Sequence, residues 1–194
     1  MPRTIEFDRQ EVLFKAMALF NEKGYTASSV QNLLDAMALN RGSLYAAFGD
    51  KRTLYLEALD LYEQLAVDGF EAFLSTGDSP LENIRAFFDI AFLGLTEEQL
   101  RAGCLFVNTI VEMTDIDQDL VVAAGSKLNR LEEALEKALK RAQEIGELGS
   151  DKDPVVLSRF LGTTIKGLRI TCKETQDKEM IRSIIEAALS VIEK

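Results

Sequence analysis

Histidine is missing from this chain of 194 residues. Histidine is the commonest general base near neutral pH and the commonest metal ligand, and it holds haem in many proteins. The nucleotide-binding patterns GxGxxG and GxxxxGK followed by Ser or Thr are absent as well. We therefore expect no enzyme activity, no catalytic residue, no metal site and no cofactor. Asp115 and Asp117 could form an acid pair, but their position favours helix capping.

Cysteine is also scarce, because the chain has only Cys104 and Cys172. They lie far apart in the sequence and belong to no CxxC pair, which excludes a zinc ribbon or a thioredoxin-type motif. We expect both to be small buried residues. A thiol sensor at Cys104 is an alternative, because Gly103 precedes it where a helix could begin, and a helix N-terminus favours thiolate.

Long apolar runs are lacking too, since none approaches the roughly 18 residues of a membrane span. Residues 1–9 lack the basic start and apolar stretch of a signal peptide. We therefore expect a cytoplasmic protein with no membrane partner.

Negative charge dominates the chain, whose net charge is −10, but it is unevenly distributed. Residues 1–52 carry +1 and the remainder carries −11. Phosphate attraction acts over about 8 Å at physiological salt, so a locally cationic surface can still bind DNA. The acidic remainder would limit non-specific binding.

Helix start and stop signals punctuate the whole chain, and no stretch alternates convincingly as a strand. The sequence predicts an all-α fold of about nine helices, with three short helices followed by longer ones. The predicted helix starts are Asp8 with Glu11, Ser28 with Gln31, Asn40, Asp50, Ser79-Pro80, Thr96 with Gln99, Asp117, Asp153-Pro154 and Asp177.

Residues 28–48 predict a short helix, a tight turn at Ala38 and Leu39, and a second short helix, which is the helix-turn-helix arrangement. The stretch from Phe20 to Tyr55 has several features at fixed spacing, which are Lys23-Gly24-Tyr25-Thr26, Val30, Arg41-Gly42-Ser43-Leu44-Tyr45, Phe48 and Lys51. With these features the stretch closely resembles the signature of the TetR (tetracycline-repressor, AcrR-like) family of transcription regulators. A later segment, from Gly103 to Glu112, resembles one branch of that family.

The predicted DNA contacts follow from the chemistry of this segment and from the resemblance. Arg41 can give bidentate hydrogen bonds to guanine, Ser43 can donate or accept, and Gly42 permits close approach to DNA. The resemblance implies phosphate contacts for Tyr45 and Lys51, whereas Leu44 and Phe48 should pack inside. The full predicted set is Thr26, Ser28, Ser29, Asn40, Arg41, Gly42, Ser43, Tyr45 and Lys51.

Two features of this segment depart from the family pattern. Ala46 and Ala47 occupy positions where family members commonly carry aromatic or histidine side chains that touch DNA. Fewer contacts are expected at that end. Met37 replaces the glycine that is usual in the turn, which would alter the angle between the two helices.

The resemblance implies that residues 1–52 form the DNA-binding domain and residues 53–194 a helical ligand-binding and dimerisation domain. The last two long helices, about 154–173 and 178–192, carry apolar stripes that suit helix packing. The family pairs these helices across a twofold axis, although the same stripes could simply close a monomer core. The predicted dimer residues are Leu157, Leu161, Thr164, Leu168, Ile181, Ile184, Ile185, Ala188 and Ile192.

A ligand pocket is predicted where polar residues interrupt apolar helices. Asn108 and Glu112 lie four apart in an otherwise apolar segment, and such a pair needs polar partners or water. They could equally bond to each other, to Lys166 or to Arg169, and the aromatic residues could be core. The predicted pocket residues are Phe88, Phe92, Phe106, Asn108, Thr109, Glu112, Phe160, Thr163 and Arg169.

Together these features predict a DNA-binding transcription regulator that binds a palindromic operator on double-stranded DNA as a homodimer. We expect repression that a small-molecule ligand relieves. A ligand that binds better when the two DNA-binding domains of the dimer (the heads) are wrongly spaced for the operator lowers the affinity for DNA. Three alternatives remain at this stage: an enzyme, a helical module whose head binds protein, and a redox-responsive regulator acting through Cys104.

Overall fold

The structure is a computed structural model that describes residues 7–193. In this range it contains helices and no strand, so the prediction of an all-α fold is confirmed. None of the described helices is both long enough and apolar enough to cross a membrane. Residues 1–6, which the argument against a signal peptide uses, lie outside the described residues.

The described chain forms two compact units. Unit 1 comprises residues 7–65 and 104–125, and unit 2 comprises residues 66–103 and 126–193. The chain therefore passes between the units three times. The predicted boundary after residue 52 separates functions, and it stays a prediction.

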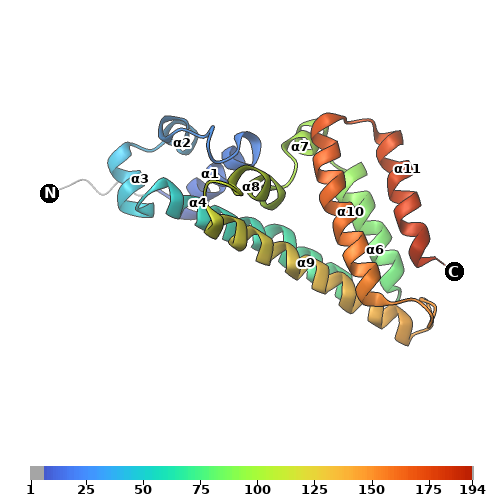
Figure 1. Cartoon of the computed structure of the whole chain (residues 1–194). Coiled ribbons are helices and arrows are strands. Elements are labelled where there is room, and N and C mark those ends of the chain that lie inside the picture. The colour runs from blue at the N-terminus through green and yellow to red at the C-terminus, as the bar shows by residue number, and fades with distance from the viewer. Residues whose placement is uncertain (1–6, 194) are drawn as a thin grey trace. The chain divides into compact units, whose positions relative to one another are not determined.

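Unit 1 contains the three predicted short helices and the start of the longer fourth one (Figure 1). Each of three helix starts is held by a carboxylate or amide oxygen that accepts backbone N–H groups. Asp8 accepts from Gln10 at 2.9 Å, Asn40 from Ser43 at 2.9 Å, and Asp50 from Thr53 at 2.7 Å, which confirms these starts. The helices of unit 1 are α1 (Arg9–Lys23), α2 (Val30–Met37), α3 (Arg41–Phe48), α4 (Lys51–Glu63), α8 (Leu105–Met113) and the first turns of α9 (Gln118–Glu144).

The start of α2 differs by one residue from the prediction. Ser29 caps the helix, and its hydroxyl accepts the N–H of Asn32 at 3.1 Å, while the Asn32 side chain accepts the N–H of Ser29 at 3.1 Å. Ser28 is buried, and its hydroxyl donates to the carbonyl of Gly24 at 2.6 Å. The capping box predicted for Ser28 and Gln31 is therefore wrong, because Ser28 is already used to close the preceding turn.

The apolar stripes of these helices meet in a common core. Phe20, Leu33, Leu44 and Leu54 come from four different helices, and each is at most 1% exposed. Leu44 and Phe48 are both buried, as predicted. Burial of one face fixes which side of α3 points outward, because residues four apart lie on the same side of a helix.

The turn between α2 and α3 depends on one residue with a left-handed backbone. Ala38 has φ 53° and ψ 39°, while the preceding Met37 is the last helical residue and is buried. Met37 therefore lies inside α2 and not in the turn, and the left-handed residue is Ala38, which carries a Cβ in a region favoured by glycine. The expected change in the angle between the two helices stays a prediction.

We expect Ala38→Gly to raise the free energy of unfolding by about 0.5 to 1 kcal/mol, because relief of the left-handed strain exceeds the entropy that glycine adds to the unfolded chain. Urea denaturation would measure the change. Ala36→Gly is the matched control, since Ala36 lies inside α2 and glycine there should destabilise by about 1 kcal/mol. If both variants lost the same free energy of unfolding, the left-handed backbone at Ala38 would not be strained.

Unit 2 is built from the remaining helices around one large apolar core. The predicted starts at Ser79-Pro80, Thr96, Asp153-Pro154 and Asp177 are all confirmed by side-chain caps. The elements are η1 (Gln64–Asp68), which bridges the two units, α5 (Gly69–Ser75), α6 (Pro80–Phe88), η2 (Asp89–Leu93), α7 (Glu97–Ala102), the rest of α9, α10 (Pro154–Glu174), α11 (Lys178–Leu189) and η3 (Ser190–Ile192).

Two continuous helical runs in this part of the chain contain π-helical stretches. The run α4, η1 and α5 continues without a break from unit 1 into unit 2, and η2 follows α6 directly. Short π-helical stretches inside α-helices are found frequently at functional sites. The first of them lies where the chain crosses between the units.

Candidate nucleic-acid interface and effector region

The N-terminal half of α3 presents a polar, exposed surface. Arg41 and Gly42 are exposed, Ser43 is half-buried, and the Tyr45 side chain is 43% exposed, while Leu44 beneath them is buried. A Cβ on Gly42 would lie 3.3 Å from Asn40 Oδ1, which is the oxygen that caps the helix. The surface therefore carries the guanidinium of Arg41 and the hydroxyl groups of Ser43 and Tyr45, and Gly42 adds no side chain between them. The opposite side of the helix is fixed by packing.

The C-terminal end of α3 is anchored by Arg9, a residue outside the predicted site. The Arg9 guanidinium donates to the carbonyl of Ala47 at 3.2 Å and lies 4.5 Å from the centre of the Phe48 ring. It also pairs with Glu57 at 2.7 Å. Arg9 therefore holds this end of α3 against α1 and α4. No motif in the sequence marks this role.

The turn between α1 and α2 carries the predicted phosphate contacts Thr26, Ser28 and Ser29. Thr26 and Ser29 are exposed, but Ser28 is 0% exposed. A phosphate contact through the Ser28 side chain is therefore a wrong prediction, because that hydroxyl faces Gly24. Ser29, at the N-terminus of α2, is the serine that remains available.

Lys51 lies against an aromatic ring at the start of α4. Its Nζ is 4.3 Å from the centre of the Tyr25 ring, which is a cation–π contact. Burial lowers the pKa of Lys51 from its usual value, and burial likewise raises the pKa of Tyr25. Both groups are held in place before any partner arrives.

The α1–α2 turn is held by a carboxylate from a distant part of the sequence. Glu112, in α8, accepts the backbone N–H of Tyr25 at 2.8 Å and that of Thr26 at 2.6 Å. Gly24 makes room for it, because φ is +82° there and a Cβ would lie 2.6 Å from Glu112 Oε2. Glu112 therefore acts within unit 1 as a clamp on this turn.

Other polar residues of α8 also bond inside unit 1. The Asn108 amide donates to the carbonyl of Asn21 at 3.3 Å. Thr109 donates to the carbonyl of Leu105 at 2.6 Å, so the Tyr55 hydroxyl donates to Thr109 at 2.8 Å. Burial raises the pKa of Tyr55 to about 12.

These contacts change how the polar pair of α8 is interpreted. The sequence predicts that Asn108 and Glu112 need polar partners, either in a ligand pocket or through bonds to each other, to Lys166 or to Arg169. Their partners in the structure are backbone groups of α1 and of the turn after it. Phe106 stacks edge-on against Tyr62, with ring centres 4.9 Å apart.

A second link in unit 1 joins α4 to the start of α9. The Arg52 guanidinium donates two hydrogen bonds to the Asp117 carboxylate, at 2.7 and 3.1 Å, and one to Asp119 at 3.1 Å. Asp117 also accepts the N–H of Leu120 at 3.2 Å, which confirms its predicted capping role. The hydrogen bond from Arg52 holds the pKa of Asp117 below its usual value.

We expect Glu112→Gln to lower the free energy of unfolding by about 1 to 2 kcal/mol, because a neutral amide keeps only one acceptor oxygen for two N–H groups. Chemical denaturation would measure it. Glu133→Gln, an exposed change in α9, is the matched control and should stay within about 0.5 kcal/mol. A Glu112 variant as stable as that control would refute the clamp.

The remaining predicted pocket residues lie in unit 2. Phe88 and Phe92 are 0% exposed and belong to its apolar core, with the Arg169 guanidinium 4.7 Å from the centre of the Phe92 ring. Phe160 and Thr163 lie on the exposed side of α10. The nine predicted residues are thus divided between the two units, and a shared pocket stays a prediction.

The predicted dimer residues are mostly buried within the chain itself. Packing of α10 and α11 in unit 2 already covers Leu161, Leu168, Ile181, Ile185, Ala188 and Ile192. Leu157, Thr164 and Ile184 are half-buried. The six buried residues therefore help to close the core within one chain, which was the alternative to a dimer contact.

A different stripe on α10 is exposed. Val156, Phe160 and Ile170 are 58%, 44% and 52% exposed, and Thr163 and Gly167 lie between them on the same side. The spacing alternates between four and three residues, which is the repeat of helices that pack along a seam. This exposed stripe lies on the side of α10 opposite the buried residues Leu161 and Leu168, and which side contacts a second copy stays a prediction.

Both cysteines are buried, Cys104 in unit 1 and Cys172 in unit 2. Burial raises the pKa of Cys172, which disfavours its reactive thiolate. Cys104 precedes α8 and makes no side-chain cap hydrogen bond. A redox role for Cys104 stays a prediction.

Comparison with known sequences gives consistent matches along the chain. The model described as "Bacterial regulatory proteins, tetR family" matches residues 12–58, and the model described as "Tetracyclin repressor-like, C-terminal domain" matches residues 80–188. The uncharacterized HTH-type transcriptional regulator YezE of Bacillus subtilis (strain 168) is 31% identical over 100% of both chains. The HTH-type transcriptional repressor ComR of Escherichia coli (strain K12) is 29% identical over 94% of this chain and 88% of ComR.

Solved structures match over nearly the whole length as well. A cysteine-substituted form of the TetR family regulator CifR, in complex with 26-base-pair operator DNA, has a TM-score of 0.86 and 27% identity. The match covers 98% of this chain and 99% of CifR.

Proposed function

Since the chain belongs to the tetR family of bacterial regulatory proteins, we propose that it represses transcription by binding a palindromic operator as a homodimer, and that a small-molecule ligand releases it. The observation that carries the proposal is the exposed N-terminal surface of α3, whose other side is locked by Leu44 and Phe48. The proposal assigns no catalytic step to the chain and places it in the cytoplasm, where it would meet DNA.

The proposed docking puts α3 into the major groove. Arg41 and Ser43 would reach base edges, and Gly42 would allow close approach. Tyr45, Ser29, Lys51 and the Thr26 side chain would contact phosphates and fix the position of the helix. Ala46 and Ala47 carry no hydrogen-bonding group in their side chains, so hydrogen bonding to base edges would rest on the first turn of α3.

The homodimer follows from the geometry of such recognition. A helix-turn-helix head reads only a few base pairs, and a twofold dimer addresses two half-sites at least one helical turn apart. We assign the dimer contact to the exposed stripe of Val156, Phe160, Thr163, Gly167 and Ile170, because the residues first predicted are largely covered within one chain.

Release by a ligand requires that the ligand favours one conformation of the protein over another. A ligand that binds better when the two heads are wrongly spaced for the operator lowers the affinity of the protein for the operator. By linkage, operator DNA lowers the affinity for the ligand by the same factor. Clamps such as Glu112 and Arg52 would keep each head rigid, so that a change in spacing is not absorbed by local flexibility.

The test is selection of bound duplexes from a random DNA pool by the purified protein at about 150 mM salt, where non-specific contacts are weakened. Enrichment of an inverted repeat is the expected result. Recovery of unrelated sequences with no repeat would overturn the proposal and favour a head that binds protein.

A further inference from the structure

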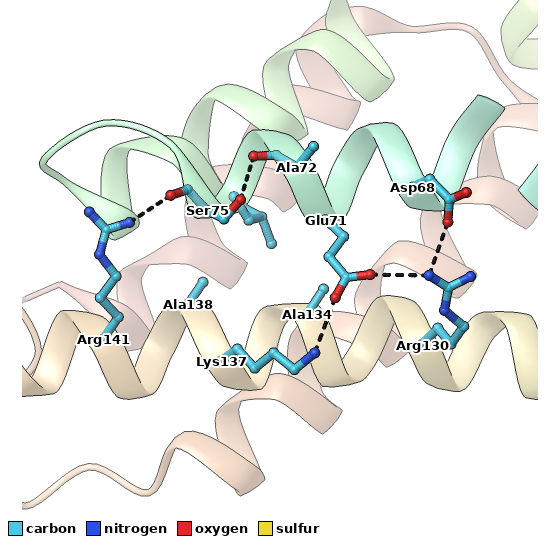
Figure 2. A pocket seen from close by; sticks show the side chains of 10 residues that line it. Asp68, Glu71, Ala72, Ser75, Arg130, Ala134, Lys137, Ala138 and Arg141 are labelled. Carbon is cyan, nitrogen blue, oxygen red and sulfur yellow. Dashed lines mark hydrogen bonds and ion pairs between the residues drawn. The ribbon is translucent and has the colours of Figure 1, made fainter. Parts of the chain in front are cut away.

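A groove lies between α5 and α9 in unit 2, and none of the predicted pocket residues lines it. Its volume is about 640 Å³, which falls in the range of sites for small molecules. Figure 2 shows the two helices side by side, with side chains from each reaching across the space between them. The lining residues are Asp68, Glu71, Ala72, Leu74, Ser75, Arg130, Ala134, Lys137, Ala138 and Arg141.

Each wall of the groove is one helical face. The α9 residues Arg130, Ala134, Lys137, Ala138 and Arg141 follow the three- and four-residue spacing that puts side chains on one side of a helix. The α5 side follows the same spacing through Asp68, Glu71, Ala72 and Ser75. The spacing explains why each set of side chains lies on one face of its helix, and both faces line the same groove.

Charged side chains span the groove at one end. Arg130 donates to Asp68 at 2.9 Å and to Glu71 at 3.1 Å, and Lys137 donates to Glu71 at 3.1 Å (Figure 2). The hydrogen bond from Lys137, followed by that from Arg130, holds the pKa of Glu71 below its usual value. Both acids of the groove are thus already engaged by cations.

The other end of the groove carries a cation with no acid facing it from the lining. Arg141 donates to the backbone carbonyls of Ser75 and Gly77. A guanidinium has five N–H donors and does not lose its charge, so two carbonyls leave donors for a further acceptor. With three cations and two acids, the lining has a net charge of +1 in a chain whose net charge is −10.

The floor between these ends is small and apolar. Leu74, Ala134 and Ala138 are each at most 4% exposed, and Ala72 on the facing wall is exposed. Small side chains leave room for an apolar body, and a guanidinium binds a carboxylate or sulfonate through two parallel hydrogen bonds. An organic cation would meet Arg130, Lys137 and Arg141 with both acids already paired.

We propose that this groove is the effector site, and that its ligand is an amphipathic organic anion whose acidic group meets Arg141 while its apolar body lies over the alanine floor. The regulatory part rests on the proposed function. Both walls lead toward the DNA-binding helices along the chain, because α4 and η1 run directly into α5 and α9 begins in unit 1. Asp68, the last residue of η1, is itself one of the residues that line the groove.

The test uses two dyes with closely related apolar bodies. These are the anion 1-anilinonaphthalene-8-sulfonate and the neutral N-phenyl-1-naphthylamine, with binding to the full chain followed by fluorescence. The anion should bind saturably, and Ala72→Phe should weaken it at least tenfold because Ala72 lines the groove. Ala66→Phe, an exposed change outside the lining, should alter affinity less than twofold. Unchanged binding by Ala72→Phe would overturn the site.

Charge preference needs a second variant. Arg141→Gln keeps a donor for the carbonyls of Ser75 and Gly77 but removes the positive charge. It should weaken the anionic dye at least tenfold and the neutral dye less than threefold, and equal losses would overturn the ligand class. Circular dichroism must show a folded chain in each case. If Ala72→Phe does not fold, Lys137→Glu replaces it, since the Lys137 side chain is 69% exposed.

Regulation is tested separately with the selected duplex in a gel-shift assay. A saturating concentration of the anionic dye should weaken operator binding at least tenfold in the unaltered chain and not in Ala72→Phe. Unchanged operator affinity would overturn the effector role. Failure to select any operator would overturn the proposed function and the effector role with it, whereas dye binding, which needs no DNA, would still decide whether the site exists.

Discussion

Arg41→Glu should weaken binding to the selected operator by about 100-fold or more. Loss of one bidentate contact to guanine costs about 1 to 3 kcal/mol, and a carboxylate placed against phosphates adds repulsion. Because Arg41 is exposed at the start of α3, the change should leave the fold intact. Fluorescence anisotropy with the labelled duplex at about 150 mM salt would measure the affinity.

The matched control for Arg41 is Arg101→Glu. Arg101 is exposed in the last turn of α7, so this variant has the same change in net charge without a change at α3. It should bind the operator within about threefold of the unaltered chain. If both variants lose the same affinity, the effect is one of overall charge, and α3 is not the reading helix.

Phe160→Glu should raise the dissociation constant of the homodimer by at least about 100-fold. Phe160 is 44% exposed in the middle of the α10 stripe, and a carboxylate buried without a partner at a twofold contact meets its own copy and costs several kcal/mol. Sedimentation at several concentrations would report the change. Operator affinity should fall with it, because two linked heads bind far better than one.

Ile145→Glu provides the control for the dimer contact. Ile145 is 52% exposed but lies just after α9 and outside the α10 stripe, so it tests whether any added surface charge disrupts association. The control should remain a dimer. A Phe160→Glu chain that still sediments as a dimer would place the contact on another surface.

The DNA-binding part of the fold was largely predictable because its signals are local. Capping side chains at Asp8, Asn40 and Asp50 act within three residues of themselves, and the four-residue spacing of Leu44 and Phe48 fixes the outward side of α3. The Ser28 capping box failed for a similarly local reason. Two adjacent serines can both cap, and only the burial of Ser28 decides between them.

The roles of α8, α10 and the groove depend on long-range partners, and the sequence carries no signal for these. Glu112 bonds residues 86 and 87 positions away in the sequence, so its need for a partner was visible but the partner was not. An apolar stripe looks the same whether it faces its own chain or a second copy, so the sequence could not decide between a dimer contact and the core for Leu161 and Leu168, which are buried within one chain. Several residues that line the groove are alanines, which carry no functional group and predict no binding site from the sequence alone.

The assembly of unit 1 from two separate stretches limits how the protein can be made and reused. As the chain leaves the ribosome, α1 to α4 are complete while Glu112 and Asp117 have not yet been synthesised. The DNA-binding helices therefore lack these two contacts until residue 117 has been made. A fragment ending at residue 65 would leave Tyr25, Thr26 and Arg52 without these carboxylates. Hybrid regulators that graft this head onto another sensor should therefore also carry residues 104–125.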